Sequence, residues 1–138
     1  MLRRDYMLKL IEQFAKMVAQ LLQLDFIDEP LVFEDDFDAL LKAYFKLKPE
    51  DLALLLEENQ DRDGLLLDEH SKNAQLSLFA RAGLVFIQKN EIQKAQICLK
   101  ITARIQKTHA ALYEFPNEEL RRIENEIALL SNALNDRD

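Results

Sequence analysis

The residues best suited to chemistry lie in the stretch NQDRDGLLLDEH, which begins at Asn59. A calcium loop of the EF-hand kind needs oxygen ligands at positions 1, 3, 5 and 12, with glycine at position 6. The stretch supplies Asp61, Asp63 and Gly64 at the third, fifth and sixth positions. His70 stands where the bidentate glutamate should be, so two oxygens and one charge are missing. We interpret the stretch as a polar turn between two helices, with Gly64 at positive φ.

The cysteine and the two histidines predict no further chemistry. Cys98 lies between apolar neighbours in a predicted helix, so we interpret it as a buried structural thiol. His70 and His109 have no partner at metal-ligand spacing. The sequence contains no phosphate-binding glycine loop and no nucleophile motif. We therefore predict no catalytic residue, no cofactor and no metal site, and we expect that the chain is not an enzyme.

Length and composition predict one helical domain. The 138 residues suffice for a single core without disulfides or metals. The hydrophobic fraction is 49%, and only 2 glycines and 3 prolines interrupt the chain. Strand-type alternation of β-branched residues is missing. The predicted fold is all-α, with about six helices in one domain over residues 1–138.

The use of cysteine and the first residues favour a cytoplasmic location. A single cysteine cannot form an intramolecular disulfide, which fits a reducing compartment. The opening MLRRDYMLKL lacks the apolar core of a secretion signal. No run approaches the roughly 18 to 20 apolar residues that cross a bilayer.

The net charge of -7 is unevenly distributed. Residues 25–63 carry thirteen acids against four bases, whereas residues 64–138 are balanced. A nucleic-acid partner is not expected, because no basic patch with interleaved aromatic residues occurs. Solvated helix faces explain the acids most simply. The alternative that they serve an enzyme or a calcium-responsive regulator stays open.

Two apolar stripes run along the first predicted helix, residues 1–24. The second stripe consists of Leu10, Phe14, Met17, Leu21 and Leu24. A helix that is apolar over more than half its circumference must be covered on both sides. This stripe therefore either belongs to the core or mediates self-association of the chain into a homo-oligomer. The bases Arg3, Arg4, Lys9 and Lys16 favour a further alternative, peripheral membrane association, which we rank below protein binding.

Breaks divide the rest of the chain into further helices. Periodic apolar residues predict a helix over 33–47, and Pro49 begins another that runs to about residue 58. A long block to Gln88 precedes a turn at Lys89-Asn90, and a helix over 92–107 follows. After Pro116, residues 117–134 form the last predicted helix.

One block resembles a tetratricopeptide repeat. Residues 76–107 read LSLFARAGLVFIQKNEIQKAQICLKITARIQK, with characteristic positions at Phe79, Gly83, Phe86, Asn90, Ala95 and Leu99. Small residues at such positions let two helices approach closely. The resemblance implies antiparallel helical hairpins in a right-handed superhelix, with 117–134 as a capping helix and 33–58 as a possible degenerate second pair. The whole chain is similar to small bacterial proteins of tetratricopeptide-like fold, a family without an assigned activity.

The resemblance also implies a partner groove. In such modules the inner face of the first helix binds peptides, and the matching residues here are Ser77, Ala80, Leu84, Ile87 and Gln88. These residues are mostly apolar, so the simpler interpretation is that they belong to the core. The predicted function is a non-catalytic scaffold or protein-interaction module that binds a protein or peptide.

Overall fold

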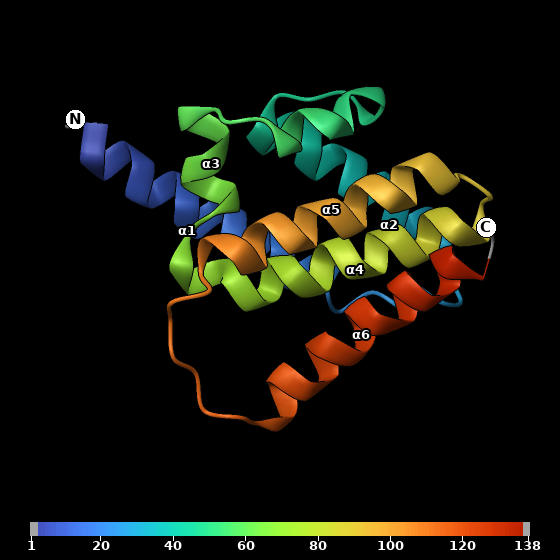
Figure 1. The fold of residues 1–138 in the computed structure, drawn as a ribbon. Coiled ribbons are helices and arrows are strands. Elements are labelled where there is room, and N and C mark those ends of the chain that lie inside the picture. Colours follow the sequence, from blue (N-terminus) through green and yellow to red (C-terminus); the bar gives the residue numbers. More distant parts are fainter. Residues whose placement is uncertain (1–2, 137–138) are drawn as a thin grey trace.

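The computed structural model describes residues 3–136, and all regular elements in that range are helical (Figure 1). In chain order they are α1 (Arg3–Leu21), α2 (Pro30–Leu40), the π-helical turn η1 (Leu41–Phe45), the 3-10 helix η2 (Pro49–Leu56), α3 (Gln60–Leu66), the 3-10 turn η3 (Glu69–Ser71), α4 (Lys72–Gln88), α5 (Ile92–Thr108) and α6 (Glu118–Asn135). The predicted all-α class is confirmed. Residues 1–2, the first two of the predicted helix over 1–24, lie outside the described residues, and so do residues 137–138 at the end of the predicted domain.

Helix α4 occupies the centre of the fold. It packs against α5 and α6 and also contacts α1 and α2. Most of its side chains are buried, which is the pattern of a helix surrounded by others. From α2, Phe37 places its ring edge-on against Phe79 and Phe86 of α4. The central helix of the fold is therefore α4 and not the first helix.

Helices α4 and α5 form an antiparallel hairpin with a short turn. Asn90 adopts the left-handed conformation with a φ of 60°, which asparagine tolerates better than most residues. The amide of Glu91 donates to the carbonyl of Phe86 at 2.8 Å and closes the end of α4. The turn predicted at Lys89-Asn90 is confirmed.

Helix α6 lies along this hairpin and packs against both of its helices (Figure 1). Ile123, Leu130 and Leu134 are its buried apolar residues. A Cβ atom on Gly83 would lie 2.6 and 2.8 Å from the methyl groups of Leu130 and 3.3 Å from the Cβ of Cys98. The close approach predicted at Gly83 thus involves α6 as well as α5.

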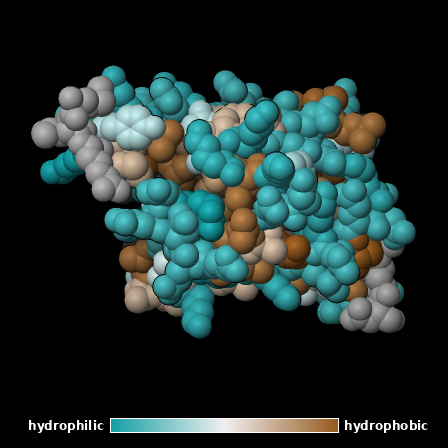
Figure 2. Space-filling model, turned by 90° about the horizontal axis from the view of Figure 1, so that it is seen from above, coloured by the Kyte–Doolittle hydropathy of each residue, from teal (hydrophilic) through white to brown (hydrophobic). Residues whose placement is uncertain are grey.

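The segment before α4 differs from the expected pair of helices. The helix predicted over 33–47 is α2 followed by the π-helical turn η1, which ends at Phe45 with Lys46 as its C-cap. The helix predicted from Pro49 is the 3-10 helix η2, and Asp51 departs from helical backbone angles within it. Because η2 packs against α5, it helps to cover the hairpin, but it is not the second α-helix of a repeat. Figure 2 looks down on the face with η2 and α3, where a patch of apolar side chains lies between hydrophilic ones.

Candidate functional site

The stretch that resembled a calcium loop is helical. Asn59 caps α3, since its side-chain oxygen accepts from the amide of Arg62 at 2.9 Å. Gly64 lies inside α3, and no described glycine has a positive φ. The predicted turn and its positive φ are therefore wrong. Burial of Leu65 and Leu66 anchors this short helix against the core, which local sequence does not reveal.

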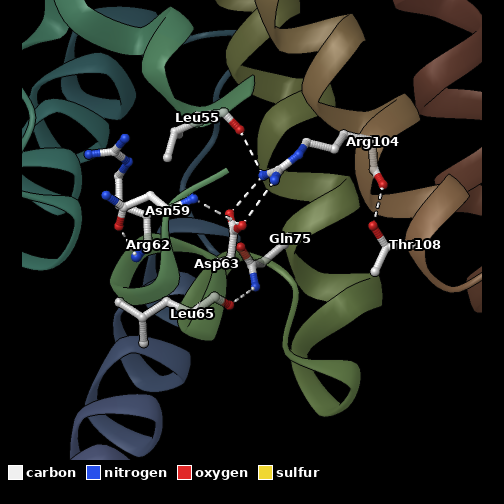
Figure 3. A network of polar contacts seen from close by, with 8 residues as sticks. All are labelled: Leu55, Asn59, Arg62, Asp63, Leu65, Gln75, Arg104 and Thr108. Carbon is white, nitrogen blue, oxygen red and sulfur yellow. Dashed lines mark hydrogen bonds and ion pairs between the residues drawn. The ribbon is translucent and has the colours of Figure 1, made fainter. Parts of the chain in front are cut away.

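An arginine from α5 holds this helix in place (Figure 3). Arg104 donates from Nη1 to Oδ1 of Asp63 at 2.8 Å and from Nη2 to Oδ2 at 3.0 Å. Nη1 also donates to the carbonyl of Leu55 at 3.1 Å, so one side chain joins α5 to both α3 and η2. The Arg104 guanidinium lowers the pKa of Asp63 below its usual range, because its hydrogen bonds favour the carboxylate.

A cleft of about 850 Å³ opens beside this ion pair. We call it the Arg104 cleft, and its lining residues are Leu56, Glu58, Asn59, Gln60, Asp63, Leu67, Arg104, Lys107 and Thr108. The lining charges balance, and both Asp63 oxygens already accept from Arg104. Within residues 3–136, no three Asp, Glu, His or Cys side chains are grouped to hold a metal ion. The principal chemistry of the Arg104 cleft is thus an internally paired carboxylate and guanidinium.

The remaining candidate chemical residues are dispersed. Cys98 is buried as predicted, and burial raises the pKa of its thiol, which disfavours the reactive thiolate. His70 is exposed and His109 is half-buried. The described structure does not bring these three side chains into one site.

The predicted partner groove lies largely in the core. Ser77, Ala80 and Ile87 are buried, Leu84 is half-buried and Gln88 is exposed. Of the two interpretations that the sequence left open, the core interpretation holds for the three buried residues.

A buried ion pair explains why Ser77 is not available to a peptide. Its hydroxyl donates to Oε1 of Glu126 on α6 at 2.9 Å. Arg81 donates from Nε to Oε2 of the same carboxylate at 2.6 Å and from Nη1 to the carbonyl of Leu22 at 2.8 Å. These hydrogen bonds connect α4 to α6 and to the segment that follows α1.

The second stripe of α1 also packs inward. Phe14 and Leu21 are buried, while Leu10, Met17 and Leu24 are half-buried against the core. The Phe14 ring makes edge contacts with Tyr44 and Phe45 at centroid distances of 5.5 and 5.3 Å. Phe14 and Leu21 therefore serve the core of the chain, and self-association through them would require α1 to leave it.

The first turns of α1 expose basic side chains, but their exposed apolar side chains do not share one face of the helix. Arg4, Lys9 and Lys16 are exposed, and the side chain of Arg3 lies outside the described part. Tyr6 and Leu8 are 57% and 56% exposed, but residues two apart lie on opposite sides of a helix. Among the helices described, none is both long and apolar enough to span a membrane.

One surface feature was missed by the sequence analysis. Residues 109–117, here called the aromatic loop, connect α5 to α6 and expose Tyr113 by 77% and Phe115 by 74%. Their rings contact each other edge-on at 5.0 Å. Between them, Glu114 forms an ion pair with Lys72 and accepts from Nδ2 of Asn73 at 3.4 Å. The alternation in YEFP was the available signal, but we interpreted it only as a break between helices.

Comparison of the chain with protein-family models, with curated proteins and with solved structures finds no match. The tetratricopeptide resemblance of residues 76–107 therefore stays a prediction.

Proposed function

We propose that this chain is a non-catalytic protein-interaction module of tetratricopeptide-like type that acts in the cytoplasm. The observation that supports the proposal is the pair of exposed aromatic side chains, Tyr113 and Phe115, in the aromatic loop. Aromatic residues dominate the binding energy of protein interfaces, because they bury a large apolar area at low cost in side-chain entropy.

The anchoring of the aromatic loop strengthens this argument. Glu114 fixes the loop to the start of α4 through Lys72 and Asn73, while its two aromatic neighbours face solvent. Side chains held in position before binding lose less conformational entropy on association. A depression of about 330 Å³ beside the aromatic loop is lined by Glu69, His70, Lys72, Asn73, Leu112, Tyr113 and Glu114. Its polar groups can form the rim of an interface whose centre is aromatic.

Site-specific photo-cross-linking in the source cells tests this proposal. A photoactivatable phenylalanine replaces Tyr113 in one variant and exposed Gln93, at the opposite end of α5, in a matched control. We expect a discrete protein adduct from position 113 and not from position 93, identified by mass spectrometry. An adduct of twice the chain mass would identify a second copy as the partner, which also supports the proposal. The absence of an adduct at 113, or the same adduct at both positions, would contradict it.

Binding measured with the purified partner completes the test. Replacement of both rings, Tyr113→Ser with Phe115→Ser, should weaken binding by about 30-fold, the effect expected for an interface hot spot. The control Tyr6→Ser removes a ring of similar exposure from α1 and should leave the affinity unchanged. Equal losses in the two proteins would show that the aromatic loop is not the interface.

A further inference from the structure

A second cleft of about 850 Å³ lies where α2 passes through η1 into η2. We call it the lysine pocket, and it is lined by Asp38, Ala39, Lys42, Lys46, Leu47, Lys48, Pro49 and Glu50. Ala39, Leu47 and Pro49 provide apolar surface beside the charged side chains of the same lining. Pockets of roughly 300 to 1,000 Å³ with an apolar lining and a few polar groups are typical of small-molecule sites.

Lysines are concentrated in this pocket although the surrounding segment is acidic. Residues 25–63 contain four bases, and three of them, Lys42, Lys46 and Lys48, line this one pocket. All three are exposed, and none forms an ion pair with any residue that the structure describes. The three lysines outnumber the two carboxylates of the lining, Asp38 and Glu50, and this excess of positive charge beside an apolar surface favours an anion with an apolar body.

The carboxylates at the rim do not cancel this charge. Lys94 of α5 and Lys89 of the turn before it place positive charge near Asp38. Their effect on the Asp38 carboxylate is opposite to that of the negative charges of Glu34 and Asp35 on its own helix. Its charge is thus partly offset from outside the pocket. The other acid, Glu50, is exposed at the start of η2.

The backbone at Lys46 provides a second, independent observation. Lys46 adopts the left-handed conformation with a φ of 58° at the end of η1, a position where glycine or asparagine is preferred. Its ammonium donates to the carbonyl of Ala43 at 2.9 Å, which keeps the side chain near the turn. Strained residues and π-helical turns both occur frequently at functional sites. The left-handed backbone at Lys46 thus places a charged residue at a position where glycine or asparagine is usual.

We propose that the lysine pocket binds a small amphiphilic anion, with its charged head at Lys42, Lys46 and Lys48 and its alkyl chain on Ala39, Leu47 and Pro49. The lysines act as point charges, so they accept a carboxylate or a phosphate head alike. The apolar lining residues favour a ligand whose charged head group carries a short alkyl chain. This inference is independent of the aromatic loop and of any protein partner.

Isothermal titration of the full chain with four probes tests the proposal. Octanoate and octyl phosphate carry both the charge and the chain, 1-octanol carries only the chain, and acetate carries only the charge. We expect one octanoate or octyl phosphate to bind per chain, and the preferred head group identifies the class of ligand. No binding of either anion, or equally strong binding of 1-octanol, would overturn the proposal.

Two matched variants locate the site. The double variant Lys42→Gln with Lys48→Gln should weaken binding of the preferred anion by about tenfold or more. The control Lys9→Gln with Lys100→Gln removes the same charge from exposed positions elsewhere and should bind like the wild type. Equal affinities of the two variants would show that binding occurs elsewhere. Amide chemical shifts of Ala39 and Leu47 should move on titration with the wild type.

Discussion

Two clefts of similar size differ in how their cations are used. In the Arg104 cleft, the guanidinium of Arg104 is hydrogen-bonded to both carboxylate oxygens of Asp63 and to the carbonyl of Leu55. In the lysine pocket, by contrast, the ammonium groups of three lysines have no carboxylate partner among the described residues. The two clefts therefore differ in the pairing of their charges and not in size. A cation without a carboxylate partner can attract an anionic ligand without first breaking an internal ion pair.

The first prediction measures this difference directly. Arg104→Ala should lower the free energy of unfolding by about 2 to 4 kcal/mol, because it leaves the largely shielded Asp63 carboxylate without its cationic partner. Lys42→Ala in the lysine pocket should change it by less than about 0.5 kcal/mol, as is usual for an exposed residue without a partner. Urea denaturation of both variants checks the prediction. Equal effects would remove the distinction between the two clefts.

The second prediction concerns the acid dependence of the Arg104 cleft. Since Arg104 lowers the pKa of Asp63 in the folded state, the pair stabilises the protein above the unfolded pKa of about 3.8. This contribution is lost as the pH falls below that value towards the folded pKa.

Asp63→Asn should therefore reduce stability by about 1 to 3 kcal/mol at pH 7, and the difference from the wild type should shrink below about pH 3.8. Thermal unfolding of both proteins over the pH range checks this sign. Exposed Asp5 supplies the matched control variant, Asp5→Asn, which makes the same substitution away from Arg104. A difference that stays constant with pH would mean that the Asp63 carboxylate is not stabilised by its partner.

Parts of the fold that depend on local pattern were predictable from the sequence. The helix expected over 92–107 is α5, and that expected over 117–134 is α6 within one residue at each end. Asn117 caps α6 by accepting from the amide of Leu120, a signal that lies within four residues. Gly83 likewise marked a close helix contact correctly.

The candidate sites depend on contacts that are distant in sequence, so they were missed. Helix α3 spans seven residues, too few to show a helical period, and its Asp63 meets an arginine 41 residues away. In the sequence, nothing sets apart the three lysines of an otherwise acidic segment, Lys42, Lys46 and Lys48. Their convergence on one pocket depends on the left-handed turn at Lys46, which follows from no residue preference.

The third prediction tests the cost of that turn. Lys46→Gly should stabilise the protein by about 0.5 to 1 kcal/mol, because glycine adopts a positive φ without the steric cost that lysine carries. Lys46→Ala removes the same ammonium but keeps the Cβ atom, so it should not stabilise. Urea denaturation separates the two variants. If alanine stabilises as much as glycine, charge repulsion rather than backbone strain is the cause.

The last prediction concerns Asp38, the half-buried acid of the lysine pocket. Burial raises the pKa of Asp38, and the charge of Glu34 one helical turn away raises it further. A carboxyl with a raised folded pKa destabilises the protein above that pKa, and the effect disappears below the unfolded value of about 3.8. Asp38→Asn should therefore stabilise at pH 7 by about 0.5 kcal/mol, the size of one like-charge pair on a helix, and should have no effect near pH 3.

Thermal unfolding at both pH values checks the Asp38 prediction, with exposed Asp36→Asn as a control on the same helix. The Asp38 result also sharpens the comparison of the two clefts, because the two aspartates should respond oppositely. Loss of charge at Asp63 should destabilise, since that carboxylate has a partner, whereas loss of charge at Asp38 should stabilise. An Asp38→Asn variant that is less stable at pH 7 would show that this carboxylate is paired after all. The lysine pocket would then be held together by its own charges, as the Arg104 cleft is.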